Sequence, residues 1–157
     1  MMDHKHYMQE AVTAALKGMQ NNEGGPFGCV IVKDGKIIGK GNNKVTSTND
    51  PTAHAEVTAI RDACKNLGSF QLEGCILYTS CEPCPMCLGA IYWARPEKVY
   101  YGSTKTDAAH IGFDDDFIYE ELKLPYADRS IPFEQLAPEV AITPFQEWAT
   151  KEDKTEY

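Results

Sequence analysis

The sequence contains no long hydrophobic run. No stretch approaches the ~20 consecutive apolar residues that span a bilayer. The first ten residues, MMDHKHYMQE, lack the hydrophobic segment of a secretion signal. These absences argue against a membrane-embedded protein and against a secreted one. We therefore expect a cytoplasmic protein that has no membrane partner and keeps its cysteines reduced.

Basic residues are also scarce. The 157-residue chain has 15 Lys and Arg against 23 Asp and Glu, which gives a net charge of −8, and the basic residues form no cluster. A protein that binds nucleic acid normally presents a basic stripe to the phosphate backbone. The charge balance therefore disfavours a nucleic-acid partner and favours a small-molecule substrate.

The order of the predicted elements indicates an α/β fold in a single domain, residues 1–157. Apolar residues recur at steps of three and four over residues 8–19 and 57–67, which predicts two amphipathic helices. Two β-rich runs flank Asp34-Gly35 and predict a hairpin. Further along, the pattern predicts strands at 75–80, 98–103 and 133–141, and helices at 83–94, 117–124 and from Pro144. Strands that alternate with helices imply a sheet covered on both faces.

The six cysteines are unevenly distributed, since Cys81, Cys84 and Cys87 fall within seven residues. In a chain without a secretion signal, such crowding indicates metal binding rather than disulfides. The other three cysteines lie in apolar stretches and are interpreted as small buried hydrophobic residues.

Two predicted helices begin with residues that could meet at one metal ion. His54 and Glu56 open one helix, and Cys84 and Cys87 open the next. The positive end of a helix dipole favours thiolates, which are the form of cysteine that binds metal. His54 and Glu56 stand ~200° apart around a helix. This spacing lets His54 bind an ion above the helix end while Glu56 stands beside it.

A site of three protein ligands leaves the fourth tetrahedral position open for water, as in catalytic zinc sites. Two thiolates and an imidazole favour zinc, and a neighbouring carboxylate such as Glu56 can shuttle protons during hydrolysis. Two alternatives remain. Cys81 would convert the set into a closed, structural Cys₃His site, or the cysteines would be ordinary core residues.

The two motifs, His54-Ala55-Glu56 and Pro83-Cys84-Pro85-Met86-Cys87, resemble the H-x-E and P-C-x-x-C signature of the cytidine deaminase superfamily. Longer segments resemble the bacterial guanine deaminases of that superfamily. They are GGPFGCVIVKDG (24–35), TNDPTAHAEVTAIR (48–61), ILYTSCEPCPMCLGAIYWARP (76–96), TDAAHIGFDDDFIYEEL (106–122) and the terminal Glu156-Tyr157.

The resemblance implies a cytidine deaminase-like, three-layer α/β/α sandwich with a mixed five-stranded sheet. It also implies a homodimer that exchanges C-terminal segments, about residues 130–157. One zinc ion per subunit would be bound by His54, Cys84 and Cys87, with Glu56 as proton shuttle and Asp115 as a second candidate to protonate the leaving amine. The residues that would contact the base are Phe27, Asn43, His54, Ala55, Asp115 and, from the partner subunit, Tyr157.

The reaction that the resemblance implies is hydrolysis of guanine to xanthine and ammonia, by attack of activated water at C2. Other deaminase substrates remain open, namely guanosine, cytosine and tRNA adenosine. A zinc module that binds without catalysis is an alternative of a different class.

Overall fold

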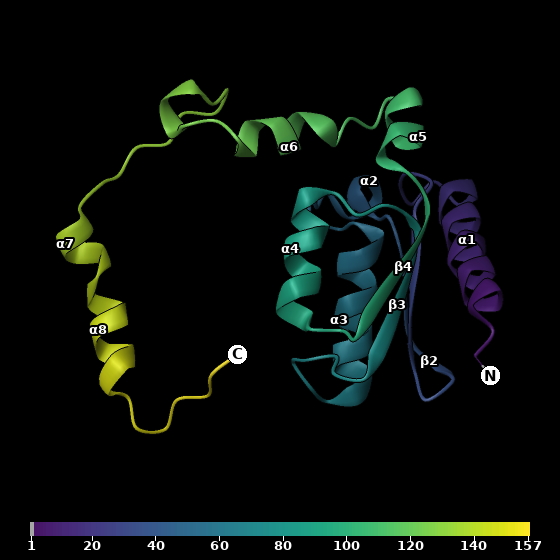
Figure 1. The fold of residues 1–157 in the computed structure, drawn as a ribbon, viewed down its shortest axis with the longest axis horizontal. Helices are drawn as coiled ribbons and strands as arrows, with labels where there is room; N and C mark the ends of the chain where they lie inside the picture. Colours follow the sequence, from purple (N-terminus) through teal and green to yellow (C-terminus); the bar gives the residue numbers. More distant parts are fainter. Residues whose placement is uncertain (1) are drawn as a thin grey trace. The chain divides into compact units, whose positions relative to one another are not determined.

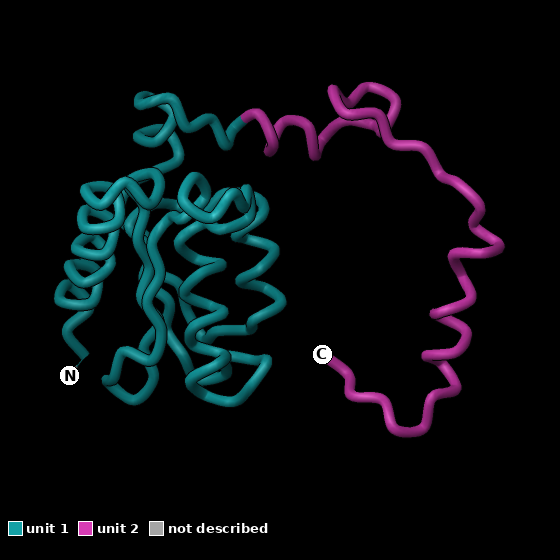
Figure 2. The backbone as a smooth tube through the Cα atoms, turned by 180° about the vertical axis from the view of Figure 1, so that it is seen from behind, with its two compact units in different colours: residues 1–116 teal, residues 117–157 magenta. Residues whose placement is uncertain are grey.

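The computed structural model describes residues 2–157, which divide into two compact units, residues 2–116 and 117–157 (Figure 2). In the first unit the elements follow in the order α1 (His4–Gln20), β1 (Gly28–Lys33), β2 (Lys36–Asn42), α2 (Val45–Thr48), α3 (Ala55–Leu67), β3 (Cys75–Cys81), α4 (Pro85–Ala94), β4 (Lys98–Ser103) and α5 (Lys105–His110) (Figure 1). The predicted hairpin and the strands and helices up to residue 103 are confirmed.

The first unit is a three-layer sandwich around a mixed sheet. Within the described residues the sheet has four strands in the order β2-β1-β3-β4, with only the β3–β4 pair parallel. Alternate residues of β1 face opposite layers. Val30 and Val32 pack with Tyr7 of α1, whereas Ile31 packs among residues of α3 and α4. Figure 1 shows α1 on one side of the sheet and α3 and α4 on the other.

The predictions of a fifth strand and of a strand at 133–141 are wrong. Residues 138–141 instead form the short helix α7 (Pro138–Ala141), with Pro138 in its first turn. Proline has no N–H to donate to a sheet ladder, but its fixed φ suits the start of a helix. The preceding residue, Ala137, has a left-handed φ of 46°, which interrupts an extended chain.

Helix α3 lies directly on strand β2 because two glycines of β2 have no side chain to separate them. A Cβ at Gly41 would be 2.4 Å from the Ala55 carbonyl oxygen and 2.5 Å from the Ala59 nitrogen, and one at Gly39 would be 2.6 Å from the Ala63 Cβ. Helix α3 ends at Gly68, whose φ is +64°. The close approach fixes the first turn of α3 at one end of the sheet.

The second unit contains the 3₁₀ turn Tyr126–Asp128, α7 and α8 (Thr143–Thr150), and α6 (Asp116–Leu122) runs into it from the first unit. The predicted helices near 117–124 and after Pro144 are confirmed. None of the residues in α6, α7 or α8 is buried. None of the helices in the described part of the chain is long and apolar enough to cross a membrane.

Replacing Gly41 by alanine should destabilise the protein. The new Cβ must push α3 away from β2, and overpacking of this kind costs about 1–3 kcal/mol. Thermal unfolding should show a Tm several degrees lower.

The matched control is Gly89→Ala. Gly89 lies inside α4, and a Cβ there meets nothing within 4 Å. Alanine is favoured over glycine in helices by about 1 kcal/mol, so this variant should unfold at the same temperature or higher. Equal losses of Tm in both variants would contradict the close approach of α3 and β2.

Candidate active site

The strand register brings three segments of chain to the same end of the sheet. Gly28 pairs with Asn42, and Cys29 pairs with Thr79. Phe27 before β1, Asn43 after β2 and the last residues of β3 therefore lie together. Helices α3 and α4 also begin at this end, with His54 and Cys84 as their N-cap residues.

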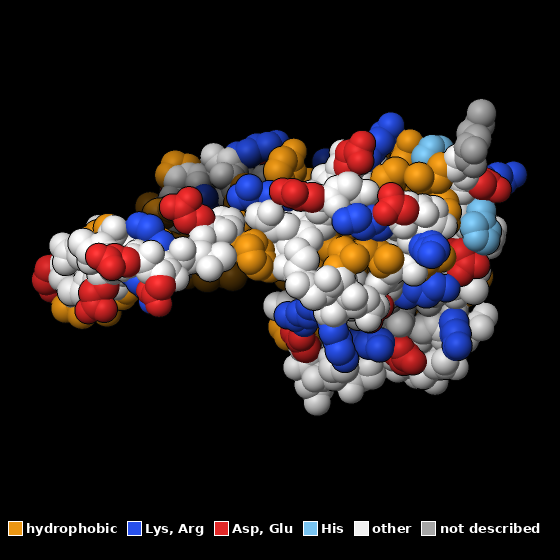
Figure 3. Space-filling view, turned by 90° about the horizontal axis from the view of Figure 1, so that it is seen from below, with side chains coloured by type: hydrophobic (Ala, Val, Ile, Leu, Met, Phe, Trp, Pro, Cys, Tyr) orange, Lys and Arg blue, Asp and Glu red, His pale blue; other side chains and the backbone are white. Residues whose placement is uncertain are grey.

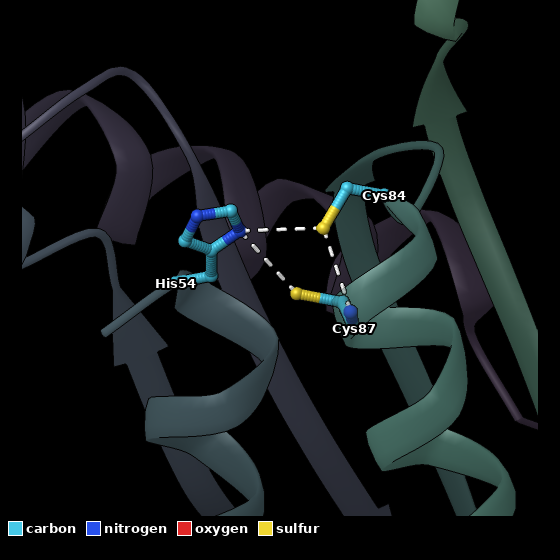
Figure 4. A group of neighbouring side chains, drawn as sticks. All are labelled: His54, Cys84 and Cys87. Carbon is cyan, nitrogen blue, oxygen red and sulfur yellow. Dashed lines mark hydrogen bonds between the residues drawn. The ribbon is translucent and has the colours of Figure 1, made fainter. Parts of the chain in front are cut away.

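The predicted metal ligands His54, Cys84 and Cys87 converge (Figure 4). The His54 Nδ1 atom is 3.5 Å from the Sγ atoms of both Cys84 and Cys87. One candidate ligand atom from each residue lies within 4.8 Å of the others. Around a tetrahedral zinc ion with Zn–N of ~2.0 Å and Zn–S of ~2.3 Å, ligand atoms stand roughly 3.5 Å apart. The donor set and its spacing therefore fit zinc.

The three candidate ligands perturb one another's pKa values. Hydrogen bonds from Cys87 and His54 hold the pKa of the Cys84 thiol at about 4, well below its ordinary value. The hydrogen bond to Cys84 and burial raise the pKa of the Cys87 thiol. The hydrogen bond with Cys84 also raises the pKa of His54.

Cys81 does not join the three ligands. Among the described residues, the group that could hold a metal contains only His54, Cys84 and Cys87. The Cys81 Sγ atom lies 3.7 Å from the Thr104 carbonyl oxygen, to which it donates. Burial also raises the pKa of the Cys81 thiol to about 11. The geometry favours the open, three-ligand arrangement over the closed Cys₃His alternative.

Glu56 is buried beside the three ligands without being one of them. Its side chain is 7% exposed, and its Oε1 atom accepts a hydrogen bond of 2.9 Å from the Thr79 hydroxyl. Burial raises the pKa of the Glu56 carboxyl above its ordinary value. A carboxylate with a raised pKa is a better proton acceptor near neutral pH, which suits a general acid–base residue.

A cavity of ≈ 330 Å³ opens next to these residues. Its size lies within the usual range for small-molecule sites. Most of the predicted site residues line it, together with several that sequence reasoning did not identify. The lining residues are Gly25, Phe27, Asn43, Val45, Thr46, Pro51, His54, Glu56, Cys81, Glu82, Cys84, Phe113 and Asp115.

Asn43 presents a hydrogen-bond donor to this cavity. Its Oδ1 atom already accepts from the backbone N–H groups of Gly25 at 3.3 Å and Val45 at 3.1 Å. Because two N–H donors require an oxygen there, the orientation of the amide is fixed. The Nδ2 group is left to donate, so Asn43 suits an acceptor atom on a ligand.

Two aromatic rings form one wall of the cavity. Phe27 and Phe113 meet edge to face, with ring centroids 4.9 Å apart and an interplanar angle of 89°. A Cβ at Gly25 would lie 3.1 Å from Phe113 and 3.2 Å from Phe27, so the missing side chain leaves room for both rings. This contact secures the loop that carries Asp115, whose carboxyl pKa is raised by burial.

The remaining predicted contacts lie elsewhere. Ala55 is fully buried in the core and is not among the residues that line the cavity. Tyr157 belongs to the second unit, where its side chain is 70% exposed. The substrate contacts assigned to these two residues stay predictions.

Sequence reasoning missed Thr79, Glu82 and Phe113. Thr79 could have been identified because it is a polar residue within the apolar strand 75–80, and a buried hydroxyl needs a hydrogen-bond partner. Glu82 accepts a 2.9 Å hydrogen bond from the Lys105 backbone N–H and so joins α5 to the end of β3. No sequence pattern distinguishes Phe113 from a core aromatic residue.

The fold and the site define a zinc-dependent deaminase domain. The family model of the cytidine and deoxycytidylate deaminase zinc-binding region matches residues 1–103, and the chain belongs to this family. Within the family, it is 60% identical to a guanine deaminase from Bacillus subtilis over 99% of this chain and 100% of that one. The crystal structure of a Bacillus subtilis guanine deaminase matches with a TM-score of 0.96 and covers 99% of both chains.

More distant relatives match a smaller share of the chain. A guanine deaminase structure from Nitrosomonas europaea is 28% identical, has a TM-score of 0.70 and covers 73% of this chain and 66% of that one. A tRNA-specific adenosine deaminase from Agrobacterium fabrum is 42% identical over 66% of this chain and 67% of its own length.

The charged side chains are mixed on the face of the protein drawn in Figure 3, where acidic side chains lie between the basic ones.

Replacing Cys87 by serine should remove most of the bound zinc, because only two of the three protein ligands remain. Metal analysis after dialysis against a weak chelator measures the zinc content per chain. Cys81→Ser is the matched control and should retain one zinc per chain. If Cys81→Ser lost as much zinc as Cys87→Ser, Cys81 would be a ligand and the site would be closed.

Proposed function

We propose that the protein hydrolyses guanine to xanthine and ammonia. The observation that carries this proposal is the 60% identity to a guanine deaminase along nearly the whole of both chains. The site supports it independently, because a metal-binding group, a buried carboxylate and an amide donor border one cavity.

The ligands would be His54, Cys84 and Cys87. A zinc ion bound there would supply a Lewis acid, which would lower the pKa of a water molecule towards ~7. Glu56 would take one proton from water and deliver it to N3 of guanine, as the water oxygen forms its bond to C2. The remaining hydroxyl proton then moves to the C2 amine through Glu56 or Asp115. The C2–N bond breaks, and ammonia and xanthine are the products.

The other side chains would hold the base in place. Phe27 and Phe113 provide an aromatic wall against which a flat purine can pack. Asn43 donates from Nδ2 to an acceptor on the purine edge, since its oxygen is occupied by backbone groups. Asp115 lines the same cavity and would be the second candidate to protonate the departing amine.

We further propose that the enzyme is a homodimer in which residues 130–157 are exchanged and the partner's Tyr157 closes each cavity. Many large apolar residues of the second unit are exposed, among them Phe133, Leu136 and Phe145. Apolar surface of this extent marks an interaction site. A lid made by Tyr157 would occupy the space that a ribose on N9 needs, so guanosine should react more slowly than guanine.

Ammonia release from a substrate panel tests the activity. Guanine should be the best substrate, ahead of guanosine, adenine, cytosine and an anticodon stem-loop. Glu56→Gln should lower kcat for guanine by about 10²-fold or more while one zinc per chain remains bound. Glutamine preserves the size of the side chain but cannot carry the proton.

Two results would contradict the assignment. Faster turnover of the stem-loop or of cytosine than of guanine would identify a different deaminase. A Glu56→Gln protein with unchanged turnover would remove Glu56 from the chemistry. Equal rates for guanosine and guanine would contradict the lid but leave the deaminase assignment intact.

Mixing two inactive variants tests the exchanged dimer. Glu56→Gln lacks the proton shuttle, and a chain truncated after residue 129 lacks the lid. After the two proteins are unfolded and refolded together, a mixed dimer would contain one complete site. About a quarter of all sites should then be active. Recovery of no activity from the mixture, although each variant alone forms folded dimers, would contradict exchange.

A further inference from the structure

Thr79 is a buried polar residue of the site that the reaction above does not use. It lies on β3, and its side chain is 1% exposed. The buried polar or charged residues of the described chain are Asn43, Glu56 and Thr79. The first two line the cavity, and Thr79 contacts one of them. The placement of this hydroxyl therefore concerns the site rather than the general core.

The Thr79 hydroxyl has two possible acceptors and one hydrogen. Its Oγ1 atom is 2.9 Å from Glu56 Oε1 and 3.1 Å from the Cys81 carbonyl oxygen. An ionised carboxylate is the stronger acceptor of the two. Glu56 forms no ion pair among residues 2–157. The Thr79 hydroxyl therefore helps to hold a buried carboxylate that has no ion-pair partner among these residues, together with hydrogen bonds from the Glu56 backbone and the Cys87 side chain.

We propose that Thr79 is a positioning residue for Glu56, an inference that rests on the proposed deaminase reaction. The Thr79 hydroxyl donates to Oε1 and keeps that oxygen an acceptor. Oε2 is left as the oxygen that takes the proton from water and delivers it to the base. The bond also holds the carboxylate beside the three metal ligands, since Glu56 is not among them.

The residue type suits this role. Threonine is β-branched, so its χ1 rotamer is restricted and the direction of its hydroxyl is well defined. Valine has nearly the same shape but no donor, and would leave Oε1 buried without this partner. Serine keeps the donor and loses only a methyl group. Alanine lacks both the hydroxyl and the methyl group of threonine. The serine and alanine variants therefore differ from each other in the hydroxyl alone.

Steady-state kinetics with guanine on purified, zinc-loaded Thr79→Val, Thr79→Ser and Thr79→Ala tests the proposal. The valine and alanine variants should lose about 10- to 100-fold in kcat, the usual effect of losing an outer hydrogen bond. Their KM should stay within about threefold of the wild-type value, because binding contacts are unchanged. The serine variant should keep kcat within about threefold of wild type. Tm and zinc content are measured for every variant.

A purely structural role predicts a different pattern. The serine and alanine variants would then lose equal activity in parallel with Tm, and that result would overturn the proposal. Wild-type kcat in both Thr79→Val and Thr79→Ala would also overturn it. If the valine variant does not fold, the kcat values of Thr79→Ser and Thr79→Ala are compared instead. A much lower kcat in the alanine variant supports the proposal, and equal values overturn it. If wild-type protein releases no ammonia from guanine, the proposed function fails and this inference fails with it.

Discussion

The meeting of two helix starts at one end of the sheet is the constraint on which the site depends. Helix α3 is brought there by its close approach to Gly39 and Gly41 of β2, and only three residues separate the end of β3 from the start of α4. Neither helix could shift by one turn, 5.4 Å, and still leave His54 Nδ1 3.5 Å from both sulfur atoms. The packing of small residues between α3 and β2 therefore helps to place the candidate metal ligand His54.

Burial turns this geometry into reactivity. Glu56 is buried and has no ion-pair partner among the described residues, so the pKa of its carboxyl is raised, while a hydrogen bond from Thr79 helps to fix its direction. Burial also raises the pKa of the Asp115 carboxyl, which lines the same cavity. Two carboxyl groups with raised pKa values on different elements suit a reaction that moves two protons. Asn43 adds a donor whose direction is fixed by backbone N–H groups.

Much of this could be predicted from the sequence, because local patterns carry it. The His-x-Glu and Cys-x-x-Cys spacings follow helix geometry, and Asp34-Gly35 supports a tight turn through positive φ values of 49° and 74°. The number of strands could not be predicted, because residues 133–141 show no clear period, and Pro138 within them favours a helix start. The Thr79–Glu56 and Phe27–Phe113 contacts join residues 23 and 86 positions apart, and no local pattern encodes such pairs.

The central claim is a zinc ion with three protein ligands and one open position. X-ray absorption at the zinc edge of the purified protein measures the ligand atoms most directly. The account predicts two sulfur atoms at ~2.3 Å and two lighter atoms at ~2.0 Å, one from His54 and one from water. A shell with three sulfur atoms, which would place Cys81 on the metal, would contradict it.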